Sequence, residues 1–119
     1  MNDLLYTYKV SQIHSIYDGD TMTVDIDLGF NMIMGKRVLR LFGIDTPELR
    51  GEEREEGLKV RDYVRELVEE VDEIYIKSHK DKSGKYGRIL ATVLLVKDEV
   101  VQDLNEHLLE KGMAKPYGK

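Results

Sequence analysis

The chain has 119 residues, the size of one ordinary domain, and 41% of them are hydrophobic, so it can bury a core of its own. It has no cysteine, which excludes disulfides, zinc–thiolate sites and thiol nucleophiles. Its formal net charge of −5 speaks against a polyanionic partner, because phosphate contacts normally come from a basic surface.

The first half of the chain predicts three strands. Residues 6–17 are extended in composition, with Ser11-Gln12 as a bulge. Apolar residues alternate with threonine and aspartate over residues 21–28, which is the period of a half-buried strand. Residues 32–42 predict the third strand, in which Gly35 marks an irregularity.

The second half changes period. Apolar residues at helical spacing predict an amphipathic helix over residues 52–70. Strands follow at residues 73–78 and 89–96, joined by a long polar, glycine-containing turn. A short helix is predicted over residues 100–111, with Gly112 as its C-terminal stop.

This order of elements predicts the fold class. We expect a β-rich α+β fold, namely a five-stranded OB-fold-like barrel with one helix between strands 3 and 4 and one C-terminal helix. No repeat, low-complexity segment or linker interrupts residues 1–119, so we expect a single domain. The fold is better determined by this pattern than the function is.

Charge is unevenly distributed along the chain. Residues 48–73 hold eleven acids and five basic residues, whereas residues 77–88 hold five basic residues and a single acid. The acidic segment is interpreted as a solvated surface. For the basic segment a solvated loop and a phosphate-binding loop are about equally favoured, and a bound divalent cation would reduce the number of lysines that a phosphate needs.

The segment from Asp18 to Thr21 is the first candidate for chemistry. Asp-Gly is an ordinary turn signal, so a hairpin is the simplest interpretation. Asp18 and Asp20 nevertheless place two carboxylates at the mouth of a strand, and carboxylate oxygens are the ligands that calcium prefers.

Arg40 interrupts an apolar run, where a guanidinium costs free energy unless an anion satisfies its donors. One interpretation is an internal ion pair with Asp45 or Glu48. The other is an arginine held in the barrel wall to bind a phosphate through two parallel hydrogen bonds. Asp45 and Glu48 flank Pro47 in a rigid turn, where one carboxylate can bind a metal and the other can orient a water.

The segment Lys85-Tyr86-Gly87-Arg88 ends the basic loop. Its glycine lets the backbone approach a ligand closely. Tyr86 can bind a phosphate or stack on a base, and Arg88 adds a second planar set of donors. The three histidines, by contrast, lack the spacing of metal ligands.

Taken in order, these segments resemble the staphylococcal nuclease (thermonuclease) family. The matching segments are Asp18-Gly19-Asp20-Thr21, the run from Arg40 to Glu48, Lys85-Tyr86-Gly87-Arg88 and Gly112-Met113-Ala114-Lys115. The resemblance covers nearly the whole chain. It also implies that the family's third, C-terminal helix is missing, and Tyr117 is the only aromatic residue where the family has two pocket tyrosines.

The resemblance implies a calcium-dependent endonuclease that hydrolyses DNA and RNA at the 5′ P–O bond and leaves 3′-phosphate ends. The implied metal ligands are Asp20, Asp45 and the carbonyl of Thr46. Arg40 and Arg88 would hold the scissile phosphate, and Glu48 would activate the water. Lys85 and Tyr86 would contact the neighbouring phosphate.

The alternative is a non-catalytic nucleic-acid-binding module with the same barrel, from which the catalytic residues are missing. Their presence here favours the enzyme. We expect a monomer that prefers single-stranded nucleic acid and has no membrane partner. The N-terminal residues lack the basic and apolar regions of a signal peptide, so we expect a cytoplasmic protein, or a secreted one if a leader has been removed.

Overall fold

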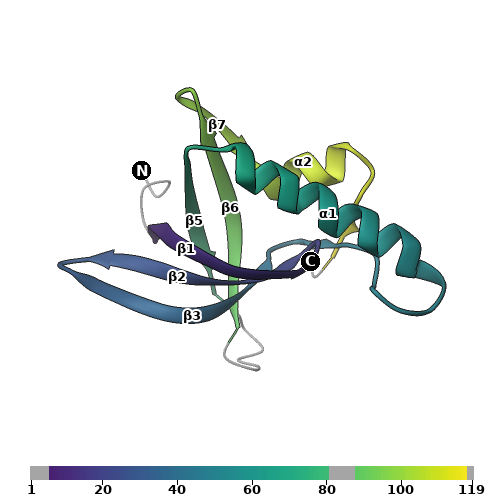
Figure 1. Ribbon diagram of the computed structural model, residues 1–119, viewed down its shortest axis with the longest axis horizontal. Coiled ribbons are helices and arrows are strands. Elements are labelled where there is room, and N and C mark those ends of the chain that lie inside the picture. Colours follow the sequence, from purple (N-terminus) through teal and green to yellow (C-terminus); the bar gives the residue numbers. More distant parts are fainter. Residues whose placement is uncertain (1–5, 81–87, 118–119) are drawn as a thin grey trace.

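The computed structural model describes residues 6–80 and 88–117. Within these residues, five long strands wind around one core, as Figure 1 shows. They are β1 (Thr7–Asp18), β2 (Thr21–Gly29), β3 (Met32–Leu41), β5 (Glu73–His79) and β6 (Ile89–Lys97).

The pairing of these strands closes a barrel. Neighbours in the order β3-β2-β1-β5-β6 are antiparallel, and β6 returns to β3 in a parallel pairing that sets Leu39 beside Ile89 and Arg40 beside Leu90. This is a closed, mixed, five-stranded barrel of the OB type. The predicted fold class is therefore confirmed.

Strand β2 shows why the sequence forms a barrel wall. Its residues Met22, Val24 and Ile26 are buried, whereas the alternating polar side chains are only partly covered. The bulge predicted at Ser11-Gln12 is present, because the β1–β2 register shifts between Val10 and Gln12. The irregularity predicted at Gly35 is also present, as the β2–β3 register shifts there.

Helix α1 (Arg54–Glu70) covers one end of the barrel and follows a short 3-10 turn, η2 (Gly51–Glu53). It buries Val60 and Val64 against the core, and Arg65 donates a hydrogen bond of 2.8 Å to the Ile16 carbonyl of β1. The helix predicted over residues 52–70 is confirmed, with its first two residues in the 3-10 turn. Neither helix of the described chain is long and apolar enough to cross a membrane.

The prediction of a helix over residues 100–111 was wrong at its start. Strand β7 (Val100–Asp103) comes first and pairs with β6, and helix α2 (Leu104–Glu110) follows. The turn between the strands has left-handed backbone at Asp98 and Glu99, and such a turn reverses the chain in register. Asp103 then caps α2 by accepting a hydrogen bond from the Glu106 N–H.

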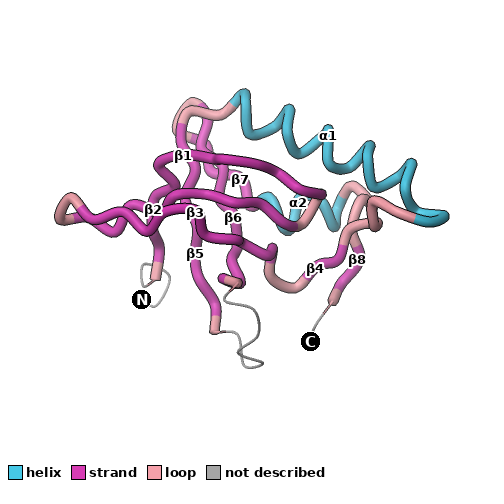
Figure 2. Tube along the Cα trace, turned by 60° about the horizontal axis from the view of Figure 1, so that its bottom comes forward, coloured by secondary structure: helices cyan, strands magenta, loops and turns pink. Residues whose placement is uncertain are grey.

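Two short strands lie at the barrel end that α1 covers. Strand β4 (Ile44–Asp45) pairs with β8 (Lys115–Pro116), and Figure 2 shows the two side by side. The sequence did not predict this pair, because two residues are too few to establish a period. The pairing brings the C-terminal segment beside Asp45.

Candidate active site

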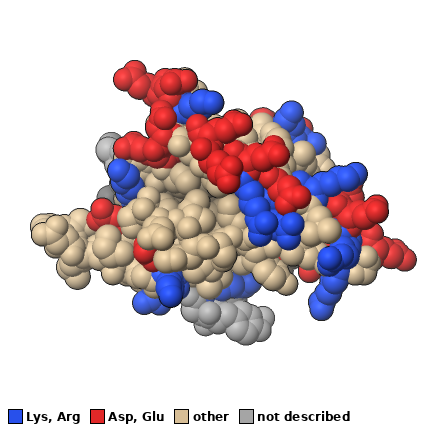
Figure 3. Space-filling view, viewed as in Figure 1, with Lys and Arg blue, Asp and Glu red and all other residues tan. Residues whose placement is uncertain are grey.

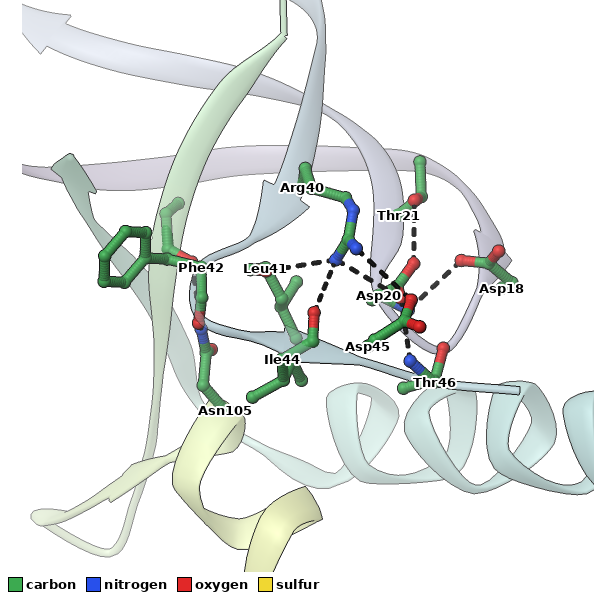
Figure 4. Close-up of polar contacts among 11 residues, drawn as sticks. Asp18, Asp20, Thr21, Arg40, Leu41, Phe42, Ile44, Asp45, Thr46 and Asn105 are labelled. Atoms are coloured by element: carbon green, nitrogen blue, oxygen red, sulfur yellow. Dashed lines mark hydrogen bonds and ion pairs between the residues drawn. The ribbon is translucent and has the colours of Figure 1, made fainter. Parts of the chain in front are cut away.

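Three segments meet where β3 leaves the barrel. The turn between β1 and β2 carries Asp18 and Asp20, the end of β3 carries Arg40, and the β4 segment carries Asp45 and Thr46. Figure 4 shows these side chains converging at the barrel end. Three of the predicted site residues, Asp20, Arg40 and Asp45, are in direct contact.

The Arg40 guanidinium lies between the two aspartates. Its Nη1 is 3.2 Å from Asp20 Oδ2, and its Nη2 is 3.4 Å from Asp45 Oδ1. Nη1 also donates to the backbone carbonyls of Ile44 (2.8 Å) and Leu41 (3.2 Å). The internal ion pair with Asp45, one of the two interpretations of the sequence, is thus present, and Asp20 is a second partner. Such backbone and carboxylate contacts hold the guanidinium in one orientation.

Asp20 is the most buried acid of the cluster, with 5% of its surface exposed. Besides Arg40, its carboxylate accepts hydrogen bonds from the Thr46 N–H (2.9 Å) and the Thr21 hydroxyl (3.0 Å). A buried carboxylate without such partners would cost several kcal/mol. These contacts satisfy the buried Asp20 carboxylate in this site.

The Asp18 carboxyl group has a raised pKa. Its carboxylate accepts the Asp20 N–H at 3.1 Å. Burial raises the pKa of Asp18 to about 7, and the hydrogen bond and negative charge of the Asp20 side chain add to this shift. Near neutral pH, Asp18 is therefore poised between its neutral and charged forms.

Glycines let the site pack closely against α1. A Cβ on Gly19 would lie 2.6 Å from a Val60 methyl group, and a Cβ on Gly57 would collide with the Glu48 carbonyl oxygen. Both positions therefore need glycine for close approach rather than for an unusual backbone. This contact fixes the turn that carries Thr46 and Glu48.

Glu48 lies in that turn with an exposed side chain. Its backbone N–H donates to the Glu53 carboxylate at 2.9 Å. Among the described residues, no contact joins the Glu48 carboxylate to Arg40. The internal ion pair between these two side chains, expected as one alternative, is thus not found there.

Arg88 directly precedes β6. The parallel pairing of Leu39 with Ile89 sets Arg88 near the β3 residue that precedes Leu39, on the barrel wall that also carries Arg40. Lys85 and Tyr86 lie outside the described residues.

Tyr117 is also at the site. Its ring lies 5.2 Å from the Arg40 guanidinium carbon, a cation–π distance, and its N–H donates to the Gly43 carbonyl at 2.9 Å. The sequence alone did not establish that Tyr117 lies at the site. The β4–β8 pairing brings it there.

Sequence reasoning missed an aromatic pair beside the cluster. The rings of Phe42 and His79 stack with centroids 4.0 Å apart and planes 9° from parallel. The buried Asn105 amide donates to the Phe42 carbonyl at 2.9 Å. Phe42 at the end of the predicted strand that carries Arg40 was visible in the sequence, but its stacking partner comes from another strand.

The oxygen atoms of Asp20, Asp45 and Thr46 are the candidate ligands for a metal ion. Arg40 contacts one oxygen of Asp20 and one of Asp45, so each carboxylate has a second oxygen outside the guanidinium. Together with the Thr46 carbonyl these are hard oxygen donors, which fit calcium in kind. No three acidic or histidine side chains converge as a metal cluster in residues 6–80 and 88–117, so carbonyl and water oxygens would have to complete the shell.

Comparison with known proteins adds the decisive observation. The family model described as staphylococcal nuclease homologue matches residues 38–119, which include Arg40, Asp45, Glu48 and Arg88. The chain belongs to this family. The resemblance seen in the sequence motifs is thereby confirmed.

Within the curated proteins, this staphylococcal nuclease homologue is similar to the uncharacterized protein MJ1439 of Methanocaldococcus jannaschii. The two are 27% identical over an alignment that covers 94% of this chain and 61% of the relative. The chain thus spans about three fifths of the length of that protein.

Proposed function

We propose that this member of the staphylococcal nuclease homologues is a calcium-dependent phosphodiesterase that hydrolyses single-stranded DNA and RNA. The observation that carries the proposal is the position of Arg40 between Asp20 and Asp45 at the barrel end. An anion-binding guanidinium and oxygen ligands for a cation are thereby combined in one site. The same site in a family of nuclease homologues supports a nucleic-acid substrate.

Electrostatics supports the requirement for a cation. Two carboxylates surround one guanidinium, so the cluster is negative when both are charged. A phosphodiester is an anion, and a like charge at 4 Å costs roughly 4 kcal/mol at the effective dielectric of a protein surface. Asp20, Asp45 and the Thr46 carbonyl would hold calcium, and the bound ion would supply positive charge where the transition state accumulates negative charge.

The two arginines have a shared task in this proposal. In-line attack on a phosphodiester builds negative charge on the equatorial oxygens, and donors fixed in advance stabilise that charge best. Arg40 is held in one orientation by the carbonyls of Leu41 and Ile44. Arg88 directly precedes the neighbouring strand β6, and in this proposal it would hold the phosphate together with Arg40.

Glu48 would orient the attacking water and accept its proton. Its side chain is exposed at the turn beside Asp45, where solvent can reach it. Lys85 and Tyr86 would contact the neighbouring phosphate. Cleavage at the 5′ P–O bond would leave 3′-phosphate ends, as the resemblance implies.

The test is cleavage of a labelled single-stranded oligonucleotide in millimolar calcium, with a chelator in the parallel reaction. We expect cleavage by the wild type that the chelator abolishes. Glu48→Gln, Arg40→Lys and Arg88→Lys should each lower the cleavage rate roughly 10²-fold or more. End-group analysis of the products should find 3′-phosphates.

Two matched variants make the same chemical changes outside the cluster. Glu52→Gln changes an exposed acid of the 3-10 turn, and Arg50→Lys changes an exposed arginine beside it. Both should cleave at the wild-type rate. Binding of the oligonucleotide without any cleavage in calcium would refute the enzyme and favour the non-catalytic binding module.

A further inference from the structure

The Phe42–His79 pair lies on the barrel surface next to the Arg40 cluster. Phe42 follows Arg40 by two residues at the end of β3, and His79 is the last residue of β5. The β5–β6 and β3–β6 registers place both His79 and Arg40 opposite Leu90. His79 and Arg40 are therefore neighbours across β6, although they are far apart in the sequence, and Phe42 lies close to Arg40 along the chain.

Hydrogen bonds fix the position of this pair from several sides. The Phe42 N–H donates to the Ala91 carbonyl at 2.8 Å, and its own carbonyl accepts from the Asn105 amide. The same amide donates to the Ala91 carbonyl at 3.1 Å and accepts from the Val93 N–H at 3.1 Å. Every polar group of the buried Asn105 side chain thus serves to join Phe42, α2 and β6.

The imidazole of His79 is also held in place. Its Nε2 lies 2.8 Å from the Thr92 hydroxyl, so the ring stays parallel to the Phe42 ring. Burial and the nearby charge of Lys77 lower the pKa of His79, with a smaller opposing effect from Asp103. The ring is therefore neutral at pH 7 and acts as an aromatic surface.

Phe42 remains 40% exposed although His79 covers one of its faces. Figure 4 shows its ring pointing away from Arg40, Asp20 and Asp45. A flat ligand on this ring would therefore lie beside the phosphate site and would not enter it. Single-stranded nucleic acid supplies such ligands, because its unpaired bases stack on aromatic side chains next to cationic groups that hold the backbone.

We propose that the Phe42–His79 pair is a base-stacking site for the nucleotide next to the one whose phosphate meets Arg40. This inference rests on the proposed function for the identity of the ligand. It adds a specificity determinant, since only an unpaired base can lie flat on an exposed ring at the protein surface. Single-stranded substrates are therefore preferred over duplexes.

The test measures the affinity for a short single-stranded oligonucleotide in millimolar calcium, with Glu48→Gln added to every protein so that cleavage is slow during the measurement. Phe42→Leu removes the flat ring and keeps an apolar side chain. It should weaken binding roughly tenfold, the effect of losing one stacked base. Phe42→Tyr keeps the ring and should bind like the wild type. Thermal unfolding of each variant checks that the fold is intact.

An oligonucleotide of the same length with abasic sites is the matched ligand. Phe42→Leu and the wild type should bind this ligand equally. If Phe42→Leu weakens the binding of both ligands equally, the stacking site is overturned in favour of a packing role for Phe42. If Phe42→Leu weakens the binding of neither ligand, the stacking site is also overturned. In a second measurement, ultraviolet crosslinking of an oligonucleotide that contains 5-iodouracil should label a peptide with Phe42 or His79.

The outcomes separate this inference from the proposed function. Cleavage by the wild type with no effect of Phe42→Leu on affinity would overturn the stacking site and leave the phosphodiesterase standing. Base-dependent binding that Phe42→Leu weakens, with no cleavage in calcium, would support the stacking site and refute the enzyme.

Discussion

Arg40 makes the internal ion pair that was one of the two interpretations its sequence context allowed. Its guanidinium is paired internally with Asp20 and Asp45, and two backbone carbonyls complete its partners. Such pairing offsets the cost of burial, which would otherwise be several kcal/mol. The same contacts hold the side chain still, which is what a phosphate-binding donor needs.

Gly57 provides a prediction in which packing opposes helix propensity. In an ordinary helix, replacing glycine by alanine stabilises by about 0.5–1 kcal/mol. Here the new Cβ would collide with the Glu48 carbonyl oxygen, so the helix and the turn must separate. We expect Gly57→Ala to lower the free energy of unfolding by about 1–3 kcal/mol, measured by urea denaturation.

Gly35→Ala is the control for this substitution. A Cβ at Gly35 would meet Asp25 Oδ1 at 3.6 Å, an ordinary contact. It should change the stability less than Gly57→Ala does. A Gly57→Ala protein as stable as the wild type would mean that the turn at Glu48 adjusts freely.

At the scale of elements, the bulge of β3 is held by a side chain of β2. Asp25 Oδ1 accepts hydrogen bonds from the Lys36 N–H and from His14 Nε2, each at 2.8 Å. Lys36 has left-handed backbone, which a residue other than glycine adopts at a cost. The Asp25 carboxylate therefore compensates for an irregularity that three strands share.

This arrangement predicts a pH dependence of stability. The Lys36 and His14 hydrogen bonds lower the pKa of Asp25 below its ordinary 3.8. A lowered pKa means that the carboxylate stabilises the fold above about pH 4 and loses this effect as the pH falls through the lower, folded-state pKa. Asp25→Asn should thus lower the melting temperature at pH 7, and the difference should shrink toward pH 3.

Glu110→Gln is the control, since it removes one charge from an exposed acid at the end of α2. Its melting temperature should follow that of the wild type across this pH range. A constant difference between Asp25→Asn and the wild type from pH 7 to pH 3 would contradict the role given to the carboxylate.

Elements whose hydrophobic pattern repeats over many residues were predictable from sequence. Short strands, and strands recognisable only by their pairing with another segment, were not. The alternation of β2 and the helical spacing of α1 act over many residues, so they indicated the right structures. Val101, Leu104 and Leu108 also have helical spacing. Val101 nevertheless lies in strand β7, because the turn at Asp98 and Glu99 reverses the chain so that β7 pairs with β6.

The same distinction holds for the site. Asp20, Arg40 and Asp45 were predictable because each stands out chemically in its own segment, and the structure brings them together. The Phe42–His79 stack was not predictable from the separate segments, because the contact depends on the register of β6 between two other strands.

At the scale of the whole molecule, charge is unevenly distributed over the face that Figure 3 shows. Figure 3 shows acidic side chains gathered over α1 and the neighbouring end of the barrel, while much of the face over β1 and β2 is uncharged. The acidic helix repels a polyanion. Under the proposed function, a nucleic acid would therefore be held by a few cations, namely Arg40, Arg88 and Lys85.

This limited set of cations predicts a weak salt dependence. For single strands, the logarithm of the binding constant falls with the logarithm of salt concentration by about 0.7 per phosphate contact, which gives a slope of roughly −2 for three contacts. Binding titrations at salt concentrations from about 50 to about 200 mM would measure this slope. A slope of about −5 or steeper would contradict a small contact area.

The parallel pairing of β3 with β6 has a consequence for biosynthesis. It joins Leu39 to Ile89, 50 positions apart, and contacts between such distant segments form slowly because a long loop must first close. A nascent chain that has emerged only as far as β5 already carries Asp20, Arg40 and Asp45, but Arg88 has not yet reached them. Under the proposed function, the ability to cut RNA would therefore arise only after the barrel has closed.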